Sequence, residues 1–169
     1  MEEIKLKKDI HTVSLLVANK PGVLVRIAQV FARRGFNIDS LAVCATLNPK
    51  YSRMTIMAQG DPQTLEQIIK QSAKLIDVIH VAEHSTMDAV SKELALVKIK
   101  CTTAAKAMVI KLLKKHKARI IDETENFIII EQTGFSADLD AFESVIKKYG
   151  MIEMMRSGKL VMAKGRGET

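Results

Sequence analysis

The chain has 169 residues, of which 47% are hydrophobic, so it is long enough to bury the core of one domain or of two small ones. Its formal net charge is +7, but only 4% of its residues are aromatic and no Lys/Arg block is long. Stacking surfaces for bases are therefore scarce, and we expect no nucleic-acid partner. No stretch approaches the ~20 consecutive apolar residues of a membrane span, so we also expect no membrane insertion.

Two features indicate the compartment. The start of the chain, Met1 to Lys5, is charged and lacks the apolar region of a signal peptide. Cys44 and Cys101 stand alone, without a Cys-x-x-Cys pair, which favours reduced thiols. We therefore expect a cytoplasmic protein.

The first half of the chain alternates strand and helix patterns after a charged lead-in. Apolar residues recur with the period of a strand or of a helix, and turn residues separate the segments. In chain order we expect a strand to about 18, a helix at about 22–34, strands at 37–46 and 53–59, a helix opened by Asp61 and Pro62, and a strand at 75–81. This order is βαββαβ.

The second half repeats that order after a linker at 84–91, which has no clear period. We expect a strand at 93–101, a helix capped by Thr102 and Thr103, a hairpin of 119–123 with 127–132, a helix capped by Ser136, and a strand at 151–162 bent near Ser157. The predicted fold class is α+β, with two ferredoxin-like βαββαβ domains in tandem. Their expected bounds are 10–84 and 93–164.

The turn between the first strand and the first helix has the residues of an anion site. Asn19 suits an N-cap, Pro21 suits a first helical turn, and Gly22 leaves the backbone bare. Free N–H groups at such a helix start would favour a carboxylate. The same residues are also ordinary helix punctuation, so both interpretations stay open at this point.

The corresponding turn of the second half differs. It contains Cys101 to Ala105, without glycine or proline. We therefore interpret the first half as an effector-binding domain and the second as an assembly or coupling domain.

The sequence pattern favours neither a metal site nor a catalytic site. His80 and His84 are four residues apart on and just beyond a predicted strand, which separates them by ~13 Å, too far for one ion. No Ser/His/Asp ordering, glycine-rich phosphate loop or paired carboxylates in an apolar setting occur. We expect no metal site, no catalytic residues and no enzyme activity of the chain alone.

Several motifs in order carry a family resemblance. The Asn-Lys-Pro-Gly-Val-Leu turn and Arg34-Gly35-Phe36-Asn37-Ile38 resemble the start of an ACT domain, a small amino-acid-sensing module. The segments at 37–41, 52–55, 74–78, 96–99 and 156–158 resemble the regulatory (small) subunit of acetolactate synthase. The resemblance extends from about Thr12 to about Val161.

This resemblance implies a non-catalytic regulatory subunit in branched-chain amino acid biosynthesis. Such a subunit would activate the catalytic subunit of acetolactate synthase and confer feedback inhibition by valine or another branched-chain amino acid. Thiamine diphosphate, FAD and magnesium would belong to the catalytic subunit and none to this chain. An amino-acid-responsive ACT regulator with a different partner is the alternative.

The expected effector site combines the turn with the start of the next strand. Backbone N–H groups of Gly22, Val23 and Leu24, next to Pro21, would hold the carboxylate of the amino acid. The side-chain oxygens of Asn19 and Asn37 would accept from its ammonium, and Ile38 would receive its methyl groups. By resemblance the site lies between the ACT domains of two protomers, with Asn37 and Ile38 from the neighbour, so we expect a homodimer.

Overall fold

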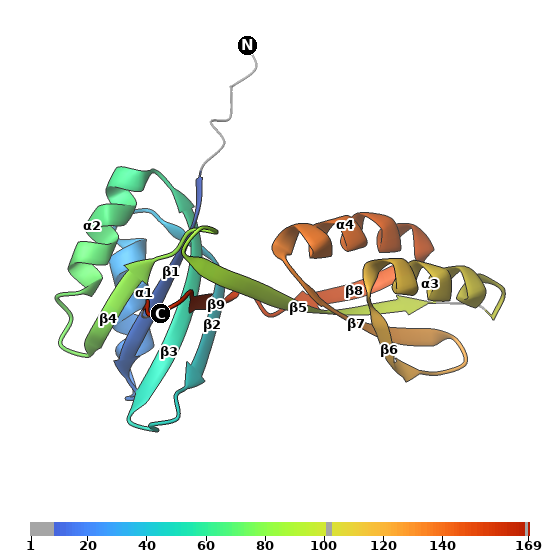
Figure 1. Cartoon of the computed structure of the whole chain (residues 1–169), viewed down its shortest axis with the longest axis horizontal. Coiled ribbons are helices and arrows are strands. Elements are labelled where there is room, and N and C mark those ends of the chain that lie inside the picture. The colour runs from blue at the N-terminus through green and yellow to red at the C-terminus, as the bar shows by residue number, and fades with distance from the viewer. Residues whose placement is uncertain (1–8, 101–102, 168) are drawn as a thin grey trace, which may run out of the picture. The chain divides into compact units, whose positions relative to one another are not determined.

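The chain forms two compact units in the computed structural model, which describes residues 9–100, 103–167 and 169. The first unit contains the chain up to Val90 together with Lys159–Thr169, and the second contains Ser91–Gly158. Each has helices on an antiparallel sheet, so the α+β prediction of two βαββαβ units is confirmed (Figure 1).

The first unit is an antiparallel sheet of order β2-β3-β1-β4 with two helices. Its elements are β1 (Asp9–Ala18), α1 (Val23–Ala32), β2 (Asn37–Ala45), β3 (Tyr51–Gly60), α2 (Pro62–Ser72) and β4 (Val78–Glu83). A short strand from the end of the chain, β9 (Leu160–Ala163), belongs to the same unit. Because β2 pairs with β3 alone, it is an edge strand of this sheet.

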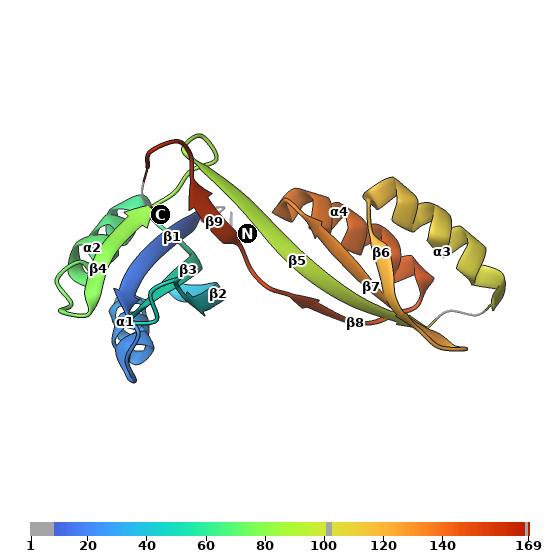
Figure 2. The ribbon, with the colours of Figure 1, turned by 60° about the horizontal axis from the view of Figure 1, so that its bottom comes forward.

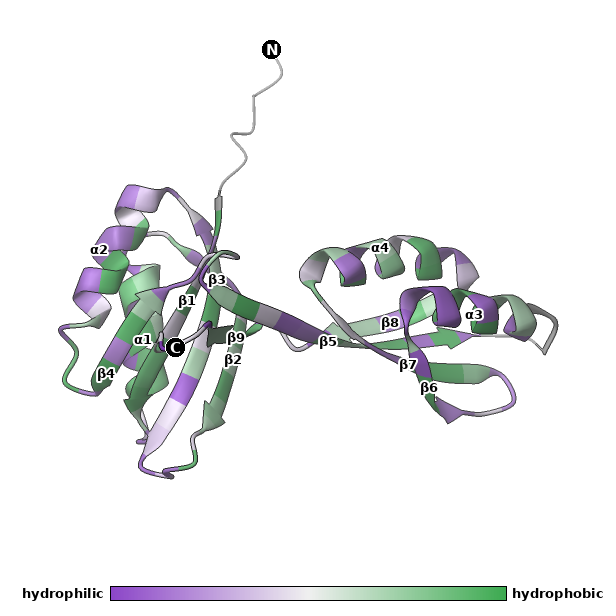
Figure 3. Cartoon of the chain, in the orientation of Figure 1, coloured by the Kyte–Doolittle hydropathy of each residue, from purple (hydrophilic) through white to green (hydrophobic). Residues whose placement is uncertain are grey.

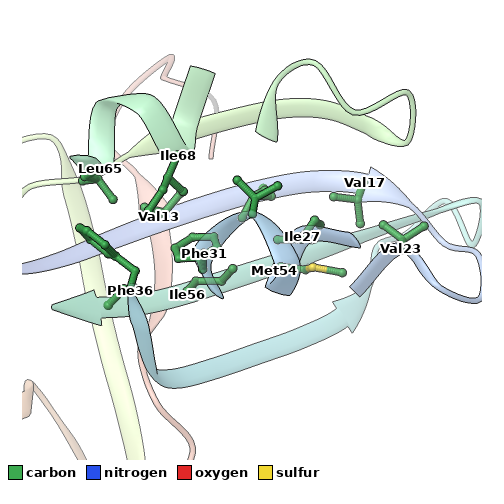
Figure 4. Packing of buried hydrophobic residues seen from close by; sticks show 13 residues of the cluster. Val13, Val17, Val23, Ile27, Phe31, Phe36, Met54, Ile56, Leu65 and Ile68 are labelled. Carbon is green, nitrogen blue, oxygen red and sulfur yellow. The ribbon is translucent and has the colours of Figure 1, made fainter. Parts of the chain in front are cut away.

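The core of the first unit follows from period-two strands that face an amphipathic helix. Val13, Leu15 and Val17 alternate along β1 and are at most 1% exposed. They pack against residues of α1, among them Ile27 and Phe31, which lie one turn apart (Figure 4). Figure 3 shows hydrophilic residues broken by hydrophobic ones along α2, as expected for a helix with one buried side.

The end of α1 is closed by a Schellman motif that aims the chain into β2. Gly35 has φ +67°, and its N–H bonds Ala32 O at 3.0 Å while Phe36 N–H bonds Phe31 O at 3.1 Å. The Phe36 ring is 7% exposed and lies against the backbone of Gly60. Local turn chemistry and one aromatic contact therefore fix where β2 begins.

The second unit repeats the topology with the order β6-β7-β5-β8. Its elements are β5 (Ala89–Lys100), α3 (Thr103–His116), β6 (Arg119–Glu123), β7 (Phe127–Gly134), α4 (Ser136–Ile146), the 3-10 turn η1 (Lys147–Tyr149) and β8 (Met151–Arg156). Its core contains Val97, Ile99 and Ile130 from the sheet and Phe142 from α4.

A buried carboxylate connects the sheet of the second unit to α4. Glu93 is 4% exposed, and its Oε2 accepts from Arg156 Nε at 2.9 Å and Nη2 at 2.5 Å. Ser136 Oγ donates to the other oxygen of Glu93. The prediction that Ser136 caps the last helix is therefore wrong: Phe135 is the N-cap, and its N–H donates to Asp138 Oδ2 at 3.0 Å.

Several predicted strand bounds are also corrected. The strand expected from Leu75 begins at Val78, because Val78 N–H closes a turn onto Leu75 O at 2.9 Å. The strand after the linker begins at Ala89, four residues earlier than expected. The final strand is divided into β8 and β9 on either side of Ser157–Gly158.

Two expectations are not decided by these bounds. The predicted cap at Thr102 and the residue Cys101 lie outside the described residues. The expected domain limits 10–84 and 93–164 stay a prediction, while the compact units group Lys159–Thr169 with the first half of the chain.

Candidate effector site

The turn from β1 to α1 is held by backbone bonds to two other loops of the first unit. Ala18 N–H donates to Asp77 O and Asn19 N–H donates to Lys50 O, both at 2.8 Å. These bonds place the turn between the β2–β3 hairpin and the loop before β4. The geometry therefore depends on three segments that are far apart in the sequence.

Gly22, and not Asn19, is the N-cap of α1. Its φ of +84° lies in the left-handed region, which a residue without Cβ enters at little cost. Asn19 instead donates from Nδ2 to Pro49 O at 3.0 Å. The predicted cap at Asn19 is therefore wrong, and Pro21 precedes the helix, because the positive φ of Gly22 delays the helix start to Val23.

The start of α1 presents backbone donors that have no protein acceptor. Within the described residues, no acceptor pairs with the N–H groups of Gly22 and Leu24. Val23 N–H makes a long 3.4 Å contact to Lys20 O, and regular helical bonding begins with Arg26 N–H to Gly22 O at 3.1 Å. Together with the helix dipole, these donors form a place for an anion.

Arg26 is a cation beside the turn that was not among the predicted site residues. It pairs with Asp77, and its Nη1 lies 3.5 Å from the position that a Cβ on Gly22 would occupy. A side chain four residues after a helix N-cap lies near the first turn, so the spacing of Gly22 and Arg26 is the signal that could have found it. Because Arg26 is already paired with Asp77, the attraction of this turn for a carboxylate comes from the backbone N–H groups and the helix dipole.

The other predicted residues near the turn differ in how much of their side chains is exposed. Val23 is 2% exposed and belongs to the core, so only its backbone faces the turn. Leu24 is 40% exposed, and Pro21 is exposed beside it. Of the predicted effector residues on α1, Leu24 is therefore the one with an exposed aliphatic side chain.

Asn37 and Ile38 do not join the turn within one chain. They follow the end of α1, whereas Gly22 precedes its start, and ten helical residues span about 15 Å. Figure 4 shows this separation, with Val23 and Phe36 at opposite ends of the labelled core. Ile38 is half-buried and packs on its own core, and Asn37 is exposed at the beginning of the edge strand β2.

Both asparagines have their amide nitrogens engaged. Asn19 Nδ2 donates to Pro49 O, and Asn37 Nδ2 donates to Asp39 Oδ1 at 2.9 Å. No donor to either side-chain oxygen is found among the described residues. Each Oδ1 is therefore available as an acceptor.

The two histidines considered for a metal do not form a site. His80 lies on β4, and His84 beyond it shares a 2.6 Å hydrogen bond between its Nε2 and Ser14 Oγ. Over the described ranges, no group of three or more His, Cys, Asp or Glu side chains could hold a metal ion.

None of the described helices is long and apolar enough to cross a membrane.

A ferredoxin-like sheet with an open helix start after its first strand is the architecture of an ACT domain. The family model described as "AHAS small subunit-like ACT domain" matches residues 13–80, and the model described as "Small subunit of acetolactate synthase" matches residues 92–165. The chain belongs to the family of acetolactate synthase small subunits.

Individual relatives agree with this assignment. The probable acetolactate synthase small subunit of Archaeoglobus fulgidus is 43% identical over 92% of this chain and 97% of its own length. The acetolactate synthase small subunit of Mycolicibacterium smegmatis is 41% identical over 92% and 91%, respectively. The crystal structure of the Thermotoga maritima small subunit superposes with a TM-score of 0.85 at 37% identity, covering 94% of this chain and 99% of that one.

Proposed function

We propose that the chain is the regulatory subunit of an acetolactate synthase, which binds and activates the catalytic subunit and confers feedback inhibition by valine or another branched-chain amino acid. The observation that carries this proposal is the pair of family matches, one on each half of the chain. Thiamine diphosphate, FAD and magnesium are assigned to the catalytic partner. This chain contributes regulation and no catalytic residue.

The carboxylate of the effector is assigned to the start of α1. Gly22 and Leu24 offer N–H groups without a protein acceptor among the described residues, and Arg26 lies beside them. Charge-assisted hydrogen bonds from such donors are about twice as strong as neutral ones. Leu24 is exposed enough to contact the aliphatic side chain.

The ammonium group is assigned to asparagine oxygens from two protomers. Asn19 lies at the turn, whereas Asn37 lies about 15 Å away at the other end of the ten-residue α1. A valine molecule is too short to touch both within one chain. A second copy that presents its own Asn37 and Ile38 from the edge strand β2 completes the site, so the effector joins the protomers of a homodimer.

A complementation experiment tests the two-protomer site. Gly22→Asp damages the turn, and Asn37→Ala damages the contribution of the neighbouring chain. Each variant alone should lose valine binding. In a mixed dimer one site combines both lesions and the other combines none, so random mixing should restore about a quarter of the wild-type sites.

The measurement is calorimetric titration of valine after the two variants have been unfolded and refolded together. Separately refolded variants, combined without exchange, are the matched control. If each variant alone loses binding and the co-refolded sample restores none, both residues belong to the site of the same protomer. A variant that keeps binding on its own places its residue outside the site. Restoration to the full wild-type level would likewise contradict the geometry.

The regulatory role itself is tested by reconstitution with the catalytic subunit. Addition of the chain should raise the rate of acetolactate formation, and valine should then lower it. In the control without the chain, valine should leave the rate of acetolactate formation by the catalytic subunit unchanged. If the chain copurifies with a different protein from cell extract and leaves acetolactate formation unchanged, the alternative of an ACT regulator with another partner holds instead.

A further inference from the structure

The second unit contains a cavity between the end of α3, the end of β7 and the start of α4. It measures about 420 Å³, within the range of small-molecule sites, and is lined by Lys92, Lys115, His116, Lys117, Gln132 and Phe135, among others. Figure 2 shows α3 and α4 on the same side of the sheet, in agreement with the shared lining. All of its lining residues belong to the second unit, so the cavity is separate from the α1 turn.

The lining of this cavity carries an excess of positive charge. Lys92, Lys115 and Lys117 are exposed, and none of them belongs to an ion pair of the described residues. The one carboxylate of the described lining is Asp138, whose Oδ2 accepts from Phe135 N–H at 3.0 Å. Three lysines against one aspartate leave a formal charge of +2 with His116 counted as neutral, so the cavity favours a ligand with two negative charges.

Lys117 occupies a backbone position that usually belongs to glycine. Its φ is +54°, and Ala118 N–H donates to Leu113 O at 2.9 Å, which is the Schellman closure of α3. Glycine adopts this left-handed conformation at the least cost, so the turn by itself gives no reason for a lysine. Lys117 lines the cavity, and binding by its ammonium group would account for a lysine here.

The helix ends beside the cavity are compatible with an anion. Carbonyl groups at the end of α3 would repel it, but Leu113 O accepts from Ala118, and His116 O accepts from Gln132 Nε2 at 3.1 Å. On the other wall α4 begins, with Phe135 as its N-cap, and the positive end of its dipole favours negative charge.

Gln132 adds a sign that a polar group belongs in the cavity. Its side chain lines the cavity and the residue is 2% exposed. Because Nε2 donates to a carbonyl, the orientation of the amide is fixed, and the buried Oε1 has no hydrogen-bond partner among the described residues. Such an acceptor usually indicates an ordered water or a hydroxyl donor that the protein itself does not supply.

The residue types of the lining favour a phosphate over a carboxylate. Arginine matches the planar carboxylate group, whereas lysine binds phosphate as a point charge, and no arginine is among the described lining residues. A phosphate monoester has three acceptor oxygens and a charge of about −2 near neutral pH. The ring of Phe135 is 52% exposed, and Lys92 Nζ lies 3.7 Å from its centroid, so aromatic surface adjoins the positive charge.

We propose that this cavity binds a small organic phosphate monoester. The phosphate group lies among Lys92, Lys115 and Lys117, and the organic part lies against the Phe135 ring. The second unit then has a ligand of its own, in addition to any role in assembly. This site does not require valine to bind at the α1 turn.

The test compares phenyl phosphate with phenyl sulfate at about pH 8, because the two have similar shapes and differ by one negative charge. The full chain is titrated with each, and with inorganic phosphate, while its backbone amide signals are followed by NMR. We expect saturable shifts at Lys117, Thr133 and Phe135 with phenyl phosphate, and weaker binding of the other two compounds.

Three outcomes of this titration would overturn the proposal. Equal affinity for phenyl sulfate would contradict the need for two charges. Equal affinity for inorganic phosphate would mean an adventitious ion only, without a contact between the organic part and Phe135. Shifts confined to Gly22 and Leu24 would mean that the anion binds at the α1 turn instead.

Lys117→Gly separates the loss of charge from a loss of stability. It removes the ammonium group and relieves the left-handed backbone, so the variant should melt at no lower temperature than wild type. Its affinity for phenyl phosphate should fall about fivefold, near the upper range for an exposed ion pair. A folded variant with unchanged affinity would contradict the site.

A matched control uses another lysine of the same helix. Lys111 is exposed on α3 and does not line the cavity, so Lys111→Gln should change the affinity by less than about twofold. Equal losses in Lys111→Gln and Lys117→Gly would indicate unspecific attraction and overturn the proposal. Lys115→Gln combined with Lys117→Gly should abolish saturable binding, and binding that persists in this double variant would contradict the proposal.

Discussion

At the scale of single residues, Gly22 combines two properties that the effector site needs. Its φ of +84° turns the chain into α1, and its missing side chain leaves the first N–H groups open. The side chain of Arg26, one helical turn later, lies next to Gly22. Any side chain at position 22 therefore enters the space in which the proposed carboxylate binds.

We predict that Gly22→Asp abolishes valine inhibition and keeps activation. The added carboxylate would occupy the N–H groups and the neighbourhood of Arg26, and so exclude the amino acid. The fold should persist, since the strain of a left-handed residue, about 1–2 kcal/mol, is offset in part by the favourable charge at a helix start, about 0.3–1 kcal/mol. The measurement is acetolactate formation by the reconstituted enzyme with and without valine.

Gly22→Ala is the control for this prediction. It imposes the same backbone strain, and its Cβ would lie 3.5 Å from Arg26 Nη1, an ordinary contact. Its valine response should be weakened less than that of Gly22→Asp. A Gly22→Asp enzyme that stays valine-sensitive removes Gly22 from the site.

Gly60 is required for packing and not for backbone freedom. A Cβ at this position would lie 2.0 to 2.5 Å from three ring atoms of Phe36, which is itself 7% exposed. We predict that Gly60→Ala lowers the free energy of unfolding of the first unit by about 1–3 kcal/mol, the usual cost of overpacking. Chemical denaturation measures it, with exposed Gln59→Ala as the neighbouring control.

A second substitution identifies the cause. If the Phe36 ring is the obstacle, Phe36→Leu combined with Gly60→Ala should cost less than the sum of the two single changes. Strict additivity of the two costs would mean that Gly60 is needed for another reason.

At the scale of elements, α2 shows a helix start that the sequence predicted correctly. Asp61 is the N-cap and Pro62 the first helical residue, as expected. Asp61 Oδ1 accepts from the backbone N–H of Thr64 at 2.8 Å. This backbone hydrogen bond from Thr64, with a further contribution from the Thr64 side chain, lowers the pKa of the Asp61 carboxyl.

We predict that the cap stabilises the first unit in a pH-dependent manner. Because the folded-state pKa of Asp61 lies below its unfolded value, its charge contributes stability above the unfolded pKa of about 4, and this contribution is lost as pH falls through the folded pKa. Asp61→Ala should lower the melting temperature at pH 7, and the difference from wild type should shrink at lower pH.

Asp61→Asn separates the cap from the charge. It keeps a capping oxygen and does not titrate, so its difference from Asp61→Ala should be independent of pH in this range. A constant gap between wild type and Asp61→Ala down to strongly acidic pH would show that the ionised carboxylate has no special role.

At the scale of the whole molecule, the proposed site links effector binding to assembly. Its two parts lie at opposite ends of the ten-residue α1, so one protomer cannot complete it. The edge position of β2 leaves Asn37 accessible to a second copy. The free energy of effector binding therefore stabilises the dimer relative to separate protomers.

We predict that valine tightens the dimer. A ligand at 100 times its Kd contributes about 2.7 kcal/mol for each site that exists in the dimer alone. Sedimentation of the chain at low protein concentration, with and without valine, measures the dissociation constant of the dimer. Asn37→Ala, which lacks one proposed contact, should show little valine dependence.

A dissociation constant that valine does not change would contradict the two-protomer site. If wild type dissociates with the same constant in both conditions while calorimetry detects valine, the site lies within one protomer. The geometry of the α1 turn would then have to bind the amino acid without Asn37 and Ile38.

The sequence alone was sufficient for the two βαββαβ units and for the α2 start. Alternating apolar residues such as Val13, Leu15 and Val17 need no distant information to predict a half-buried strand. Asp61 followed by Pro62 is likewise a local signal, because the cap and the first turn lie within four residues. These parts depend on short-range chemistry, which a sequence states directly.

Only the tertiary structure decided which residues share a site. Asn19 does not cap α1, because its side chain donates to the carbonyl of Pro49, thirty residues later. Ser136 does not cap α4, because its hydroxyl donates to the buried Glu93. Arg53, Leu16 and His80 meet only through strand register, and β9 reaches them from the other end of the chain. Long-range pairing determines such contacts, and no local pattern in the sequence predicts it.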